Sequence, residues 1–139
     1  MTCIHDDPEV FATTALAGFA SGYARNVRPV AGGVLRSTAT PEGKVAVVVG
    51  GGSGHYPAFA GFVGPGMADA AVAGDVFASP SAHSVAHVTR LAHRGGGILL
   101  GFGKYAGDVM NFGLAAERLQ SEGIDVRILP VTDDVASGP

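Results

Sequence analysis

A short stretch near the middle of the chain, Lys44–Pro57, constrains the fold more than any other. It begins with Val45–Val49, an unbroken run of valine and alanine, and continues through three glycines to Ser53, Gly54 and His55. A strand buried on both faces of a parallel sheet has this composition, because neither face needs a polar residue. Glycines after such a strand let the backbone turn sharply and present N–H groups to a ligand. The stretch predicts a buried strand that stops at Gly50, with a turn beyond it.

The glycine pattern matches neither of the common phosphate-binding signatures. A dinucleotide-binding G-x-G-x-x-G that begins at Gly50 needs glycine at position 55, where the sequence has His55. No Lys-Ser or Lys-Thr pair follows to complete a phosphate loop. A nucleotide-binding α/β domain is therefore disfavoured. Two interpretations stay open: a structural strand-to-helix turn, or a site in which His55 acts as an acid, a base or a hydrogen-bond donor.

The rest of the sequence alternates apolar strands with helical patterns, which predicts an α/β fold with a mostly parallel sheet and helices packed on it. Strands are expected over 26–31, 44–49, 70–73, 98–102 and 126–131, helices over 8–22, 57–62, 80–93 and 108–122, and a loop over 32–43. Ser79 is expected to cap the third helix. The buried helix faces are expected at Phe11, Ala15, Phe19 and Tyr23, and at Val109, Phe112, Ala116 and Leu119.

Length and composition set the class of protein. A chain of 139 residues is one domain, and a net charge of −3 without a Lys/Arg cluster argues against nucleic acid as a partner. Cys3 is the only cysteine, and the longest uncharged stretch near the N-terminus, Val10–Ala24, is too short to cross a membrane. We therefore expect a cytoplasmic protein without membrane contact.

The chain is also apolar for a free-standing domain, with 47% hydrophobic and 15% charged residues. Such a composition indicates surface that another part of the molecule or a second copy covers. We expect a homo-oligomer, with exposed apolar side chains at Phe59, Phe62 and Val63.

Five further side chains have the residue type or spacing of a site. Asp108 follows a second glycine-ended strand and is expected to open a helix, so it is either a cap or a base. His83 and His87 lie four residues apart but share a face with arginines and lack an intervening glutamate, which favours a solvated surface. The adjacent acids at positions 133 and 134 could bind a metal, but paired acids in a loop after a strand are more often caps or turn formers. No metal site is expected.

Taken together, four motifs resemble those of the dihydroxyacetone kinase family, in that family's order and spacing. They are Gly50–His55, Gly74–Ser81, Tyr105–Phe112 and Val131–Ala136. Covering nearly all of residues 44–136, they are similar to the N-terminal half of the family's ketose-binding subunit or domain. The resemblance implies an incomplete N-terminal portion of a two-part subunit, from a phosphotransferase that acts on a terminal hydroxyl of a short ketose.

The same resemblance implies a role for each site residue. Gly52, Ser53 and Gly54 would line the sugar pocket, His55 would be the acid/base and hydrogen-bond partner of the substrate, and Asp108 would take the hydroxyl proton. The family holds the substrate carbonyl covalently on a histidine of the second half, which these 139 residues lack, so activity of the chain alone is not expected. ATP and magnesium are expected on a separate helical subunit or domain, with no cofactor bound by this chain.

Two departures from the family pattern concern the substrate. Gly103 occupies a position where relatives acting on dihydroxyacetone often carry lysine, and Tyr56 a position where they often carry glutamate. Both departures remove charge and are more similar to the branch that acts on erythrulose. The alternative is a non-catalytic module of the same ancestry that binds a sugar or a phosphate.

Overall fold

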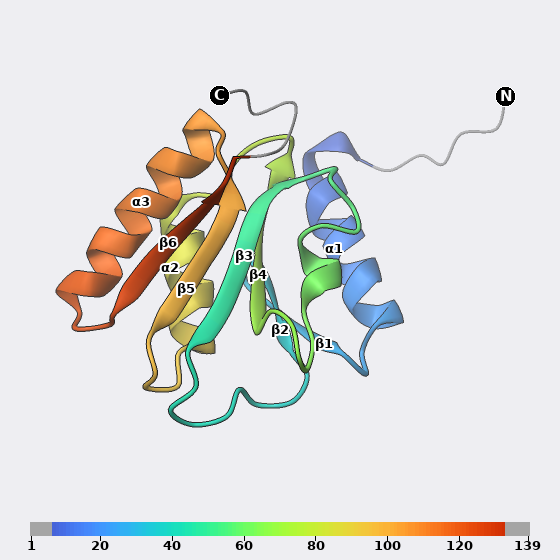
Figure 1. The fold of residues 1–139 in the computed structure, drawn as a ribbon. Coiled ribbons are helices and arrows are strands. Elements are labelled where there is room, and N and C mark those ends of the chain that lie inside the picture. Colours follow the sequence, from blue (N-terminus) through green and yellow to red (C-terminus); the bar gives the residue numbers. More distant parts are fainter. Residues whose placement is uncertain (1–6, 133–139) are drawn as a thin grey trace, which may run out of the picture.

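The computed structural model describes residues 7–132, which form one six-stranded sheet with helices on both faces (Figure 1). Its elements are η1 (Pro8–Val10), α1 (Phe11–Gly22), β1 (Val27–Val30), β2 (Gly33–Arg36), β3 (Ala46–Ser53), η2 (Ala60–Phe62), β4 (Ala70–Val76), α2 (Ala82–Ala92), β5 (Ile98–Gly103), α3 (Ala106–Ser121) and β6 (Val126–Val131). The strand order is β1-β2-β4-β3-β5-β6, and β4, β3, β5 and β6 run parallel. The predicted mostly parallel α/β sheet is confirmed.

Each face of the sheet has its own apolar core. Helices α2 and α3 cover one face, where the largest fully buried side chain is Phe112. Helix α1 and the segment with η2 lie on the other face, over a smaller core that includes Val34 and Ala71. Because strands β3 and β5 are parallel neighbours in the register Val49↔Gly101, their carboxyl ends meet at one edge, as expected.

The glycines of the central stretch lie inside the strand rather than after it, so the predicted end of the strand at Gly50 is wrong. Strand β3 continues to Ser53, and only Gly54 has a positive φ, +104°. Gly50, Gly51 and Gly52 are needed because neighbouring atoms lie where a Cβ would be placed, not because the chain turns there. The loop predicted over 32–43 contains β2, whose antiparallel pairing with β4 the local sequence did not reveal.

Several helix details also differ from expectation. Ser81, not Ser79, caps α2, since its hydroxyl accepts a hydrogen bond from the Ser84 amide at 3.1 Å. The segment predicted as a helix over 57–62 holds only the short η2 and contains two cis peptide bonds, Tyr56–Pro57 and Ala58–Phe59.

The predicted helix faces are partly wrong. In α1 the buried side is Ala20 with Leu16 and Phe19, while Phe11 and Tyr23 are exposed. In α3 the buried side begins at Asp108, one residue before the expected Val109. Asp108 lies four residues before the fully buried Phe112, and side chains with this spacing share a helix face.

None of the helices in residues 7–132 is both long and apolar enough to span a membrane. Cys3 and the acids at positions 133 and 134 lie outside the described residues.

Candidate active site

His55 lies just beyond the end of β3, among aromatic rings from its own loop and from two other segments. Its ring is 5.1 Å from that of Phe77 and nearly perpendicular to it, and 6.1 Å from that of Phe59, also edge-on. The ring of Tyr105 stacks on it at 6.4 Å. The imidazole is therefore held in an aromatic setting while remaining exposed to solvent.

Asp108 lies in the first turn of α3 and points into the protein, with 6% of its surface exposed. The helix cap is Tyr105, which contradicts the interpretation of Asp108 as a cap. One carboxylate oxygen, Oδ1, has no hydrogen-bond partner among residues 7–132.

The surroundings of Asp108 change its proton affinity. Burial raises the pKa of Asp108, while a hydrogen bond with Ser79 and the charge of His55 lower it by less, so that the pKa lies above its ordinary value. A buried carboxylate with one free oxygen and a raised pKa is suited to accept a proton.

His55 and Asp108 line the same two clefts at the carboxyl edge of the sheet. One cleft, of about 470 Å³, extends over the apolar face of β3, β5 and β6. The other, of about 400 Å³, lies towards Phe77 and Ser79. Both are also lined by Gly52 and Tyr105, and both fall in the size range of small-molecule sites. The structure therefore brings together the two side chains that the sequence singled out.

The other predicted site residues divide into two groups. Gly52 lines both clefts, whereas Ser53 is buried and donates from its hydroxyl to the Gly74 carbonyl at 2.7 Å. Gly54 provides the turn into His55 and lines neither cleft. Ser53 and Gly54 thus shape the loop rather than face the open space.

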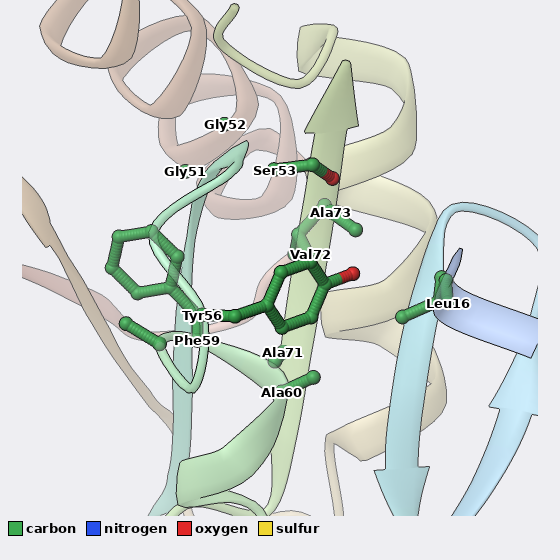
Figure 2. A pocket seen from close by; sticks show the side chains of 11 residues that line it. Leu16, Gly51, Gly52, Ser53, Tyr56, Phe59, Ala60, Ala71, Val72 and Ala73 are labelled. Atoms are coloured by element: carbon green, nitrogen blue, oxygen red, sulfur yellow. The ribbon is translucent and has the colours of Figure 1, made fainter. Parts of the chain in front are cut away.

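Figure 2 shows the inner side of this loop. The ring of Phe59 lies beside Gly51, where an added Cβ would approach a ring carbon to 2.4 Å. Tyr56 lies over β4 near Leu16 of α1, around a small cavity of about 10 Å³. The loop that holds His55 is therefore anchored by apolar packing.

Gly103, which departs from the family pattern, and the neighbouring Lys104 differ in their position relative to the clefts. Gly103 lines the larger cleft, with the ring of Tyr105 packed where a side chain would begin. Lys104 is exposed and lines neither cleft. Among residues 7–132 no cluster of three metal-ligating side chains occurs, so His83 and His87 form no such group there.

Three residues near the site were not identified as site residues from sequence. Phe77 and Tyr105 surround His55, and Ser79 lines the smaller cleft beside Asp108 and lowers its pKa. All three lie in the motifs that carried the resemblance, but nothing in their residue type indicates that they contact the two side chains.

The fold and the site define an α/β domain that presents a histidine and an aspartate in one cleft at the carboxyl ends of parallel strands. Residues 17–139 match the model of the Dak1 domain. The chain belongs to the Dak1 domain family.

Relatives of known function have a high identity to this chain. It is 57% identical over 137 residues to an L-erythrulose 1-kinase of Mycolicibacterium smegmatis, covering 99% of this chain and 24% of the relative. It is 56% identical over 139 residues to an L-erythrulose kinase of Pectobacterium atrosepticum, covering 100% and 24%. The chain therefore spans about a quarter of the length of these relatives.

A solved structure has the same fold. The crystal structure of the dihydroxyacetone kinase from C. freundii in complex with AMP-PNP and Mg2+ superposes with a TM-score of 0.87 at 36% identity. The match covers 96% of this chain and 26% of that one. The arrangement of strands and helices described above is thus the same as in part of that structure.

Proposed function

We propose that this chain is the ketose-binding part of a ketose kinase, which phosphorylates a terminal hydroxyl of dihydroxyacetone or erythrulose. The observation that carries the proposal is the placement of His55 and Asp108 on one cleft, in a chain of the Dak1 domain family. The named kinase relatives support the reaction class.

In this proposal Asp108 accepts the proton of the attacking hydroxyl. Its unpartnered Oδ1 offers a hydrogen-bond site for that hydroxyl, and burial favours the protonated product of the transfer. His55 donates a hydrogen bond to the sugar and acts as an acid/base at the substrate. Phosphoryl transfer depends mainly on such positioning and on charge placement.

ATP and magnesium are assigned to a helical nucleotide-binding subunit or domain that acts with this chain. No group of three metal-ligating side chains occurs in residues 7–132. The nucleotide supplies the phosphoryl group, and this chain supplies the site that binds and orients the ketose.

We favour a four-carbon ketose over dihydroxyacetone as the substrate. Gly103 leaves the wall of the larger cleft without a cationic side chain, and the cleft has mainly apolar neighbours such as Leu129 and Val131. Tyr56 lines neither cleft, so Gly103 is the departure that bears on the charge of the cleft wall. The two erythrulose kinases named above agree with this assignment.

Binding tests the ketose assignment directly. L-Erythrulose and dihydroxyacetone are titrated against the isotopically labelled chain, with glycerol as a control that lacks the carbonyl. We expect amide shifts at Gly52, His55 and Asp108 for the ketoses, with the tighter binding for erythrulose. Shifts confined to other parts of the sheet would contradict the proposed site.

Turnover tests the roles of the two side chains, in the full-length gene product with ATP, magnesium and its nucleotide-binding partner. Asp108→Asn is expected to lower kcat at least about a hundredfold with little change in KM, the scale for loss of a positioned base. His55→Asn should impair kcat and KM together. Asp125→Asn, at an exposed acid at the other end of the sheet, is the control.

Near-normal turnover of Asp108→Asn would remove the catalytic role of Asp108. Ketose binding without phosphoryl transfer in the native protein would instead favour a non-catalytic sugar-binding module.

A further inference from the structure

The connection between β4 and α2 contacts both of the proposed catalytic side chains. Phe77 packs its ring edge-on against His55, and Ser79 lines the smaller cleft beside Asp108 and lowers its pKa. The two contacts come from residues only two apart in the sequence, while His55 and Asp108 are more than fifty residues apart. A single short segment, Phe77–Ser79, thus touches both.

Phe77 is not placed by the need to bury an apolar side chain. It is 72% exposed and adopts φ +49°, a left-handed conformation that costs a non-glycine residue about 1 kcal/mol or more. Its amide donates to the Ser53 carbonyl at 2.8 Å, and an added Cβ on Gly54 would meet its ring at 3.1 Å. The ring is therefore packed against the loop that carries His55.

Ser79 lies against the start of α3. Its Cβ is 3.2 Å from the position of a Cβ on Gly107, the residue before Asp108, and Ser79 and Asp108 line the same cleft. The Ser79 hydroxyl lies 3.3 Å from the Pro80 carbonyl oxygen, and its proximity lowers the pKa of Asp108. Because Ser81 caps α2, the hydroxyl of Ser79 does not serve as the helix cap.

The backbone between the two side chains is fixed to both central strands. A Cβ on Gly74 of β4 would lie 2.1 Å from the Ala78 carbonyl oxygen, and one on Gly52 of β3 would lie 2.8 Å from the Ala78 nitrogen. The Ala78 amide also donates to the Asp75 carbonyl at 3.1 Å. Two glycines thus let the segment lie directly on the sheet, which holds it in one place.

We propose that Phe77–Ser79 is a positioning segment, in which Phe77 fixes the ring of His55 and Ser79 fixes the carboxylate of Asp108 for proton transfer. The proposal rests on the proposed function of His55 and Asp108. It adds that both are oriented by one segment clamped to β3 and β4.

The charged and titratable groups around Asp108 determine what a pH profile reports. The hydroxyl of Ser79 approaches it from the segment, the imidazole of His55 acts from the β3 loop, and Tyr105 lines the same clefts from the start of α3. Because the Ser79 hydrogen bond and the His55 charge both lower the pKa of Asp108, loss of either should raise it.

The first test uses Ser79→Ala in the full-length gene product with ATP, magnesium and its nucleotide-binding partner. We expect the acidic limb of the kcat profile to move to higher pH, with kcat lowered about tenfold and KM little changed. Ser79→Thr keeps the hydroxyl and should restore the limb. An unchanged profile in Ser79→Ala would overturn the part of the proposal that concerns Asp108.

The second test uses Phe77→Ala, which is expected to fold because the side chain is mostly exposed. We expect the imidazole resonances of His55 to shift and broaden, and turnover to fall about ten- to a hundredfold, the scale of a small misplacement. Phe77→Tyr keeps the ring and should behave as the parent. Phe11→Ala, which removes an exposed ring at the start of α1 that lines neither cleft, is the control.

The imidazole spectrum separates this proposal from the proposed function, since it needs no turnover. If the resonances of His55 are the same in Phe77→Ala as in the parent, Phe77 does not position it, whatever the activity of the kinase. If they shift while Asp108→Asn keeps normal turnover, the proposed function fails and the packing role of Phe77 stands.

Discussion

At the scale of single residues, the two buried aspartates within residues 7–132 have opposite surroundings. Asp108 has a free oxygen and a raised pKa at the carboxyl edge of the sheet. Asp69 has no exposed surface, and it is ion-paired to Arg36 at 3.1 Å and to Lys44. Burial alone would raise the pKa of Asp69, but hydrogen bonds from Lys44, the Val47 amide and Arg36 outweigh it and hold the pKa below its ordinary value. One aspartate is suited to reaction, the other to structure.

Asp69 should therefore contribute to acid stability. Because its folded-state pKa is lowered, its contribution is present above the ordinary aspartate range near pH 4 and is lost as pH falls through the folded pKa. Asp69→Asn should lower the free energy of unfolding by about 3 kcal/mol at pH 7, since removing one partner leaves buried charge unpaired. In this variant the free energy of unfolding should also decrease less steeply as the pH is lowered.

Urea denaturation at a series of pH values measures both effects. Asp125→Asn is the matched control, because its pair with Arg127 is exposed and should change stability by less than about 1 kcal/mol. Equal losses in the two variants would show that the Asp69 cluster does not stabilise the fold.

The two kinds of aspartate also differ in how far sequence can predict them. Asp108 was found because it follows a strand ending in glycine, a local signal. Asp69 bonds to Arg36 and Lys44, which are 33 and 25 residues away, and nothing around it in the sequence marks those partners. The contacts of Phe77 and Ser79 were missed for the same reason, since only the fold brings them to His55 and Asp108.

At the scale of elements, several other parts of the domain pack closely against the glycines of strand β3. A Cβ on Gly50 would lie 2.8 Å from the Val72 carbonyl oxygen and 2.9 Å from Phe112, while Gly51 and Gly52 are crowded by Phe59 and Ala78. The buried strand was predictable from its apolar run. The length of the strand was not predictable from sequence. Glycines occur both in turns and in strands that another segment approaches closely, and only the packing partners distinguish the two cases.

Gly50→Ala should therefore destabilise the domain by about 1–3 kcal/mol, the cost of overpacking a filled core. Gly113→Ala is the matched control, since it lies within α3 with no atom within 4 Å of an added Cβ. It should stabilise by about 0.5–1 kcal/mol through helix propensity. Thermal unfolding measures both, and a stabilising Gly50→Ala would contradict the close packing of β3.

At the scale of the whole molecule, the sheet is covered unequally on its two faces. Helices α2 and α3 cover one face, whereas on the other α1 and the η2 segment lie over β1, β2 and β4. The registers Val49↔Gly101 and Gly101↔Leu129 place these residues in one row across β3, β5 and β6. That row borders the larger cleft, and Leu129 and Val131 are exposed there.

The composition predicted exposed apolar surface but could not place it. Of the three expected side chains, Phe62 is exposed and Phe59 partly so, while Val63 is buried in the smaller core, so its assignment was wrong. Whether a side chain of β5 or β6 is covered depends on which elements cross that face, and this is set by the topology rather than by the local pattern. The proposed homo-oligomer would cover such a surface.

We expect this row to give the isolated chain an affinity for apolar probes. Leu129→Gln removes a side chain that is 53% exposed, so it should lower the fluorescence of a bound hydrophobic dye and reduce self-association in sedimentation, while the melting temperature changes little. Leu114→Gln is the matched control: it is 52% exposed, but on α3 and outside the cleft. The fluorescence of dye bound at this row should fall in Leu129→Gln and stay unchanged in Leu114→Gln.

Two results would contradict this prediction. A parent chain that sediments as a clean monomer and binds no dye would show that this face has no affinity for apolar partners. Equal effects of the two variants would show that the affinity is spread over the surface rather than concentrated beside the site.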